Sequence, residues 1–205
     1  ILFLIQTFVI YLSLFSFSAF LKEKVINTRF YNLNIYETNL IVINFYLFVF
    51  LFSLNIEAQE AETTTYYFIR HAEKDRTNDS NKNPNLTKKG IHRAENWGAI
   101  FENVKFDLIY ATKFNRTIQT AKPIAIKQHL EIQYYSPSHL YDEDFKLKTT
   151  GKTVLVVGHS NTTPQFANDI LGEEKYPEIN DDNNGNLYIV TIQNKNKSSI
   201  LLKIN

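Results

Sequence analysis

The stretch Phe68-Ile69-Arg70-His71-Ala72-Glu73-Lys74 joins an apolar run to a cluster of charged and reactive side chains. The apolar residues 66–69 have the length and composition of a short β-strand. Parallel strands of α/β proteins bring their functional side chains to the carboxyl edge of the sheet. We therefore expect a strand over 66–69 that presents Arg70 and His71 at such an edge.

The composition favours a globular domain with an N-terminal appendage. The 205 residues include 22 Lys and Arg against 21 Asp and Glu, which gives a net charge of +1. This balance gives no indication of a nucleic-acid partner. The chain contains no cysteine, so disulfides, thiolate nucleophiles and cysteine metal sites are all excluded.

Two apolar runs precede the charged segment. Residues 1–21 carry no charge and are long enough to cross a hydrocarbon core of about 30 Å. Residues 40–54 form a second, shorter run, and the small Ala58 after it is typical of a secretory signal that is cleaved nearby. The basic residues between the runs favour the cytoplasmic side, and they are Lys22, Lys24 and Arg29.

The sequence therefore predicts two parts. Residues 1–58 are a hydrophobic N-terminal region, either a signal peptide or a retained membrane anchor, and residues 59–205 are one compact domain. Both interpretations export the domain to a periplasmic or extracellular location, with membrane contact only through an uncleaved N-terminal region. A third alternative, buried core helices, lacks the polar face that water would require. Because the chain contains no methionine, translation upstream of the true start is an alternative origin for the residues before 22.

Residues 59–205 alternate between strand and helix patterns, which predicts an α/β fold with right-handed crossovers. The clearest strand is 153–157, whose apolar run is typical of a central strand covered on both faces. The expected fold is a three-layer α/β/α sandwich with a mostly parallel central sheet. The other predicted strands are 106–110, 131–135, 187–192 and 199–204, and the predicted helices begin at Thr87, span 113–129 with a kink or division at Pro123, span 142–148, and run from Pro164 to Gly172.

Two of the predicted strands are each followed by a histidine, His71 in the first case and His159 in the second. Arg70 precedes the first histidine, and Arg116 lies in the first turn of another predicted helix. In a parallel sheet these side chains meet at one edge without a matching set of carboxylates. Arginine is suited to phosphate because its planar group donates two parallel hydrogen bonds and stays charged at any working pH. The pattern predicts an oxyanion pocket.

Several motifs resemble those of a known family. Arg70-His71-Ala72-Glu73 resembles the R-H-G/A-E signature of the histidine phosphatase superfamily, in its small single-domain branch. The resemblance implies a phosphoglycerate mutase-like fold. It continues, in the family's order, through Leu86-Thr87-Lys88-Lys89-Gly90 with Arg93-Ala94, through Tyr110-Ala111-Thr112 with Arg116-Thr117 and Gln119-Thr120-Ala121, and through Val156-Val157-Gly158-His159-Ser160-Asn161.

The resemblance also implies roles for the pocket residues. His71 is the expected nucleophile, forming a phosphohistidine, while a general acid protonates the leaving group. That acid is expected at Asp142, because Leu140-Tyr141-Asp142 resembles the family's L-x-E with Asp in place of Glu. The alternatives for the acid are Glu143, Asp144 and Glu73. The residues expected to hold the phosphoryl group are Arg70, Arg116 and His159, and the other expected substrate-binding residues are Thr112, Asn161 and Glu73. No metal or cofactor is expected.

We expect a phosphatase that hydrolyses small phosphomonoesters through a phosphohistidine on His71 and needs no metal. One alternative is a phosphohistidine-protein phosphatase, whose imidazole leaving group needs less help from an acid. Another is a catalytically silent domain that binds phosphate or phosphopeptides. The complete set of two arginines and two histidines argues against the silent domain.

Overall fold

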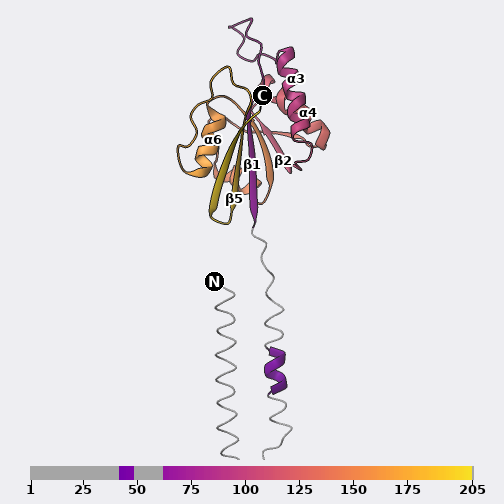
Figure 1. Cartoon of the computed structure of the whole chain (residues 1–205), viewed down its shortest axis with the longest axis vertical. Coiled ribbons are helices and arrows are strands. Elements are labelled where there is room, and N and C mark those ends of the chain that lie inside the picture. The colour runs from indigo at the N-terminus through magenta and orange to yellow at the C-terminus, as the bar shows by residue number, and fades with distance from the viewer. Residues whose placement is uncertain (1–41, 49–61, 205) are drawn as a thin grey trace, which may run out of the picture. The chain divides into compact units, whose positions relative to one another are not determined.

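The computed structural model describes residues 42–48, which form a helical segment, and residues 62–204 (Figure 1). The chain divides into two units, Ile1–Gln59 and Glu60–Asn205, and the second contains the sheet. In the described residues no helix has the length and apolar composition needed to span a bilayer. The predictions for 1–41 and 49–61, which include the signal peptide, the membrane anchor and the cleavage near residue 58, lie outside the described residues.

Within residues 62–204 the chain forms a six-stranded mixed sheet with the strand order β3-β2-β4-β1-β5-β6. The strands are β1 (Thr63–Arg70), β2 (Leu108–Ala111), β3 (Ile132–Tyr134), β4 (Thr153–Gly158), β5 (Asn186–Gln193) and β6 (Asn196–Lys203). The first four run parallel to one another, whereas β5 is antiparallel to β1 and β6 is antiparallel to β5. The prediction of a mostly parallel sheet is therefore confirmed.

Helices cover both faces of this sheet, as Figure 1 shows for α3 and α4 on one side and α6 on the other. Their bounds are α3 (Lys88–Ile100), α4 (Asn115–Gln128), α5 (Glu143–Thr149) and α6 (Thr162–Leu171). Phe145 of α5 packs in the same core cluster as Phe166 of α6, so these two helices share a face. The three-layer α/β/α architecture is confirmed.

Successive side chains of a strand point to opposite faces of the sheet, so the sheet contributes to two hydrophobic cores, one on each face. Tyr66 and Phe68 of β1 pack on the α5 and α6 side, whereas Ile69 packs on the α3 and α4 side with Trp97. The central β4 does the same in its unbroken apolar run, 154–157, because a strand covered on both faces needs apolar side chains on both. Each fully buried side chain of this kind contributes about 1.5–3 kcal/mol.

One helix differs from its predicted form. α4 continues through Pro123 as one helix from Asn115 to Gln128, so the proline does not divide it. A helix can lose the single amide donor of a proline when its packing compensates. Here α4 packs closely against α3, because a Cβ atom added at Gly98 of α3 would lie 3.5 Å from the Pro123 Cβ, which is an ordinary van der Waals distance.

Candidate active site

The two predicted histidines meet at the carboxyl edge where β1 and β4 end side by side. Arg70 and Gly158 form the last residue pair of these parallel strands. The His71 amide donates to the Gly158 carbonyl at 2.9 Å. The rings of His71 and His159 then lie 5.6 Å apart between their centroids. The structure thus brings both imidazoles to the edge at which the sequence placed them.

His71 is oriented by its own backbone neighbours. Its Nδ1 lies 2.8 Å from the Ala72 carbonyl oxygen, which only accepts, so Nδ1 carries the hydrogen and Nε2 keeps its lone pair. The amide of Asn184 donates to the His71 carbonyl at 2.8 Å and fixes the backbone. Burial lowers the pKa of His71 to about 3, and the charges of Arg70 and Arg116 act in the same direction. A neutral imidazole with an open Nε2 is a competent nucleophile.

Arg70 is buried beneath the site and held by the loop before β5. Its Nη1 donates to the carbonyls of Asn180 at 2.8 Å and Asn183 at 3.0 Å, and its Nη2 pairs with Asp181 at 2.6 Å. Asp181 also binds Arg76 at 2.7 Å, and hydrogen bonds from Arg76 and Arg70 lower the pKa of Asp181 to about 2. The Arg70 Nε–H is buried and has no partner. A buried donor of this kind is ready for an anion.

His159 is held in one tautomer by two threonines and an arginine. Its Nε2 lies 2.9 Å from the Thr112 hydroxyl, which in turn lies 3.0 Å from the hydroxyl of Thr117. Its Nδ1 faces Arg116 Nη2 at 3.5 Å, and a guanidinium can only donate. The Nε2 atom therefore carries the hydrogen and donates to Thr112. Burial, with Arg116 and Arg70 nearby, lowers the pKa of His159 to about 4.

Arg116 projects into the site from the first turn of α4. Its guanidinium carbon lies 4.4 Å from the centroid of the Phe114 ring, so it stacks on that aromatic face. Burial lowers the pKa of Arg116, and the charge of Arg70 adds to this effect. Its Nε–H is the second buried guanidinium donor without a partner. Both arginines thus have an unused donor, and both are near enough to His71 for their charges to lower its pKa.

Two guanidinium groups and a second imidazole lie near His71, and this set of groups suits a transferring phosphoryl group. Residues 66–136 match the sequence profile of the histidine phosphatase superfamily, branch 1. This match covers about a third of the chain and includes Arg70, His71 and Arg116. No curated protein sequence matches the chain.

Solved structures with the same fold come from several histidine phosphatase superfamily proteins. One is assigned as the phosphohistidine phosphatase SixA of Agrobacterium tumefaciens, with 20% identity, a TM-score of 0.51, and coverage of 69% of this chain and 99% of that one. Another is the protein histidine phosphatase SixA complexed with tungstate, with 15% identity, a TM-score of 0.55, and coverage of 68% and 96%. The phosphoglycerate mutase of Bacillus anthracis has 15% identity, a TM-score of 0.54, and coverage of 71% and 95%. At these identities the similarity establishes the fold.

In the described residues, no hydrogen bond or ion pair links Asp142, the expected general acid, to the groups around His71. Its Oδ1 accepts from the Phe145 amide at 2.8 Å, so Asp142 is the N-cap of α5. Tyr141 before it stacks edge-on against Tyr66, with 6.2 Å between ring centroids. Asp142 therefore begins a helix on the face of the sheet.

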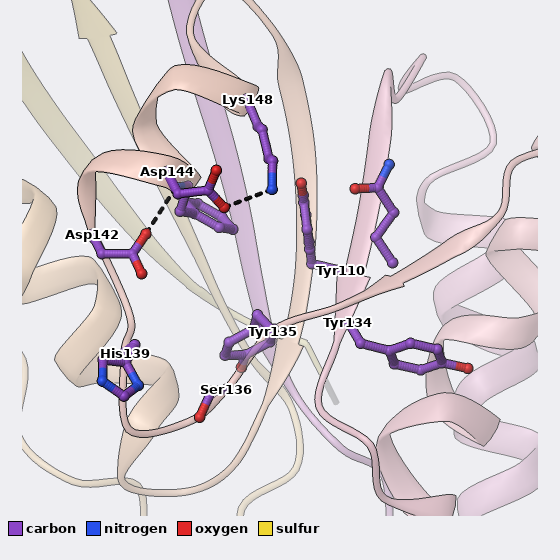
Figure 2. A pocket seen from close by; sticks show the side chains of 10 residues that line it. Tyr110, Tyr134, Tyr135, Ser136, His139, Asp142, Asp144 and Lys148 are labelled. Carbon is purple, nitrogen blue, oxygen red and sulfur yellow. Dashed lines mark hydrogen bonds and ion pairs between the residues drawn. The ribbon is translucent and has the colours of Figure 1, made fainter.

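Figure 2 shows Asp142 at a pocket of about 400 Å³ on that same face. Asp144 and Lys148 form an ion pair of 2.6 Å on one wall, and Tyr110 lies beside it. The alternative acid Glu143 is likewise engaged, because it pairs with Lys146 at 2.5 Å. Neither of these carboxylates lies in the described hydrogen-bond network of His71. The other residues that line the pocket are Gln133, Tyr134, Tyr135, Ser136, His139 and Phe145.

Glu73 points to α3. The Nε of Arg93 donates to both Glu73 carboxylate oxygens at 3.0 Å, and Lys89 Nζ lies 3.4 Å from Oε1. Burial raises the pKa of Glu73, but the hydrogen bonds from Arg93 outweigh it and leave the pKa below its ordinary value. Glu73 thus stays ionised and ties the segment after His71 to α3. Asn161, the last predicted binding residue, is exposed at the N-terminus of α6 and makes no capping hydrogen bond through its side chain.

Several residues of the site have no sequence motif. Asp181 and Asn184 hold Arg70 and His71 from more than a hundred positions away, and Thr117 supports Thr112. The only sequence signal near the first two is the turn at Asn184-Gly185. Within residues 42–48 and 62–204, no group of three His, Asp or Glu side chains is placed to hold a metal ion.

Proposed function

We propose that the protein hydrolyses phosphomonoesters through a covalent phosphohistidine on His71. The observation that carries this proposal is the pair of buried, unpartnered Nε–H donors on Arg70 and Arg116, two arginines whose charges act on His71. A phosphoryl group supplies the acceptor oxygens that these donors lack.

In the proposed reaction His71 Nε2 attacks phosphorus, and the bond from phosphorus to the leaving oxygen breaks with its electron pair on that oxygen, which takes a proton from a solvent water molecule. The Nδ1–H bond to the Ala72 carbonyl stabilises the positive charge that the ring acquires. Arg70 and Arg116 stabilise the charge on the equatorial oxygens, which is most of what a loose transition state requires. Water then attacks the phosphohistidine, the phosphorus–nitrogen bond breaks, and His71 is regenerated. Guanidinium groups supply the positive charge, so we propose no metal for either step.

A second candidate function is the dephosphorylation of phosphohistidine in proteins. The support is that the nearby carboxylates are already engaged in other interactions. Arg93 binds Glu73, Asp142 caps α5, and Asp181 is ionised between two arginines. A site without a protonated carboxyl group favours substrates whose leaving group is weakly basic. Imidazole is such a leaving group, and the SixA structures of the same fold carry the name phosphohistidine or protein histidine phosphatase.

The decisive experiment measures turnover of aryl phosphates with graded leaving-group pKa values, in the presence of a chelator. We expect turnover by the protein, loss of it in His71→Ala, and retention in the matched variant His92→Ala, since His92 is exposed on α3. A steep fall in kcat with rising leaving-group pKa favours the phosphohistidine substrate, whereas a flat dependence reveals an acid and favours alkyl phosphomonoesters.

Rapid quenching gives a second readout of the same proposal. A phosphohistidine is acid-labile and base-stable, so an adduct with these properties should be trapped on His71. An acid-stable adduct, turnover that survives His71→Ala, or turnover that requires a metal would each refute the mechanism. Phosphate binding without turnover would identify the silent binding domain instead.

We also propose that residues 1–58 export the domain. The support is the apolar run 40–54 followed by the small Ala58. Expression of the full chain in a bacterial host and mass spectrometry of the mature amino terminus test this proposal. We expect a terminus near residue 59 outside the cytoplasm, and a chain that still begins before residue 40 would contradict the signal peptide.

A further inference from the structure

The segment after His71 is fixed in an extended conformation that determines where Lys74 points. Residues 73–75 pair with residues 85–87 through a β-bridge and two backbone hydrogen bonds of 2.8 and 2.9 Å. In extended backbone, successive side chains point to opposite sides. Glu73 points to α3, where Arg93 binds it. Lys74 is therefore on the other side, which by the same alternation is also the side of Arg76, and Arg76 shares Asp181 with Arg70.

The electrostatic surroundings of Lys74 agree with this placement. Partial burial lowers the pKa of Lys74, and the nearby charges of Arg76, Arg116 and Arg70 lower it further, while Asp181 opposes them. The ammonium group of Lys74 is thus close enough to Arg76, Arg116 and Arg70 for their charges to act on it. The 85–87 strand that holds it is itself tied to α4, because Gln119 Oε1 accepts from the Leu86 amide at 2.7 Å.

Positive charge in this cluster is not balanced by the protein. The Asp181 carboxylate is shared between Arg70 at 2.6 Å and Arg76 at 2.7 Å. In the described part of the chain no carboxylate lies within ion-pair distance of Lys74 or Arg116. A phosphoryl group at His71 brings a charge of about −1.5 to −2. The cluster carries four positive charges, on Arg70, Lys74, Arg76 and Arg116. Asp181 and a bound phosphoryl group together leave about one of these charges without a counterion.

We propose, on the basis of the function proposed above, that Lys74 binds a second anionic group, a carboxylate or a further phosphate, on the leaving part of the substrate. An ammonium on a flexible stem is a compact charge that suits such a group at varying distance. The buried Arg70 and the half-buried Arg116 hold the transferring phosphoryl group, while Lys74 lies beside the half-exposed Arg76. An anion there also relieves the repulsion among the cations.

Matched substrate pairs test this proposal. O-phospho-L-serine and O-phosphoethanolamine differ by a carboxylate, and the bisphosphate and monophosphate of 1,3-propanediol differ by a second phosphate. We expect the protein to prefer the more anionic member of each pair by about tenfold to a hundredfold in kcat/KM, the range for one charge-assisted hydrogen bond. The two pairs distinguish a carboxylate ligand from a phosphate ligand.

Substitution of Lys74 should remove that preference selectively. In Lys74→Met we expect the ratio within each pair to fall to near one, while kcat/KM for phosphoethanolamine stays within about twofold of the unmodified protein. Lys74→Glu should invert the ratio. Lys89→Met is the matched control, because Lys89 is an exposed lysine that contacts the same segment from α3, and its ratio should equal that of the unmodified protein.

Three results would overturn the proposal. The first is equal kcat/KM within the pairs for the unmodified protein. The second is an equal loss of kcat/KM for both members in Lys74→Met, which would place Lys74 on the transferring phosphoryl group, and the third is the same loss in the Lys89 control. Failure of the proposed function is a separate outcome, namely no turnover of any substrate. In that case the second anion site is tested by calorimetric binding of propanediol bisphosphate and monophosphate. Tighter binding of the bisphosphate that Lys74→Met abolishes supports the site, and equal binding refutes it.

Discussion

Replacing His71 by Asn should flatten the loss of stability that the domain suffers in acid. The folded domain holds the pKa of His71 at about 3, against an ordinary value of 6.5. Between these values the unfolded chain binds a proton that the folded chain does not, so the free energy of unfolding falls as the pH falls from 6.5 toward 3. Each pH unit in this window costs about 1.4 kcal/mol. From about pH 6.5 to about pH 4.5, His71 therefore accounts for about 2–3 kcal/mol.

Urea unfolding of the protein and of His71→Asn at about pH 7.5 and about pH 4.5 measures this contribution. Urea is preferred to guanidinium, which is itself a cation and would screen the charges of the site. The unmodified protein should lose about 2–3 kcal/mol more than the variant between the two pH values. His92→Asn, at the exposed position on α3, is the control for a histidine outside the site.

Equal losses in the protein and in His71→Asn would refute the reasoning. They would mean that His71 accepts a proton in the folded state as readily as in the unfolded one. The His71 imidazole would then be cationic in mild acid, with a hydrogen on both ring nitrogens, so that Nε2 would have no lone pair for attack. The proposed nucleophile would lose its physical basis together with the stability argument.

Two further variants test the surroundings of the site. Thr112→Val keeps the shape of the side chain but removes the acceptor of His159 Nε2–H. We expect kcat to fall by about tenfold to a hundredfold, while the free energy of unfolding falls by only about 1 kcal/mol. An unchanged kcat would show that the tautomer of His159 does not affect turnover. Gly90→Ala should destabilise the domain by about 1–3 kcal/mol, because its Cβ would collide with the Glu73 carbonyl, whereas Gly98→Ala on the same helix meets only a contact of 3.5 Å; equal urea midpoints for the two variants would contradict this.

The sequence predicted the sheet and the two histidines because these features depend on local patterns. The strand β4 can be recognised from the sequence, because a strand that is buried on both faces is a continuous apolar run without alternating polar residues. The strand before Arg70 ends at a sharp change from apolar to charged residues. Once both strands are assigned as parallel neighbours, His71 and His159 must lie at one edge, and the structure places their rings 5.6 Å apart.

Contacts between distant loops could not be predicted in the same way. Asp181 lies in a polar loop with no periodicity, and nothing local shows that its carboxylate reaches Arg70, 111 positions earlier. The position of Asp142 was ambiguous for a different reason. A short carboxylate at the start of a helix satisfies both a motif with an acid and an N-cap, and the structure shows Asp142 as the N-cap of α5.

The loop that carries Asp181 ties the chemistry of the first strand to the last part of the chain. Arg70 is 2% exposed, and its partners Asn180, Asp181 and Asn183 all precede β5. β5 also pairs with β1, which would otherwise be an open edge of the sheet. During synthesis, residues up to about 178 can form the parallel half of the sheet but leave a buried guanidinium without counterion or carbonyl acceptors. The surroundings of Arg70 are therefore incomplete in a nascent chain until residues 180–183 have emerged, so we expect a ribosome-bound fragment that lacks them to be inactive however much of the parallel sheet it has formed.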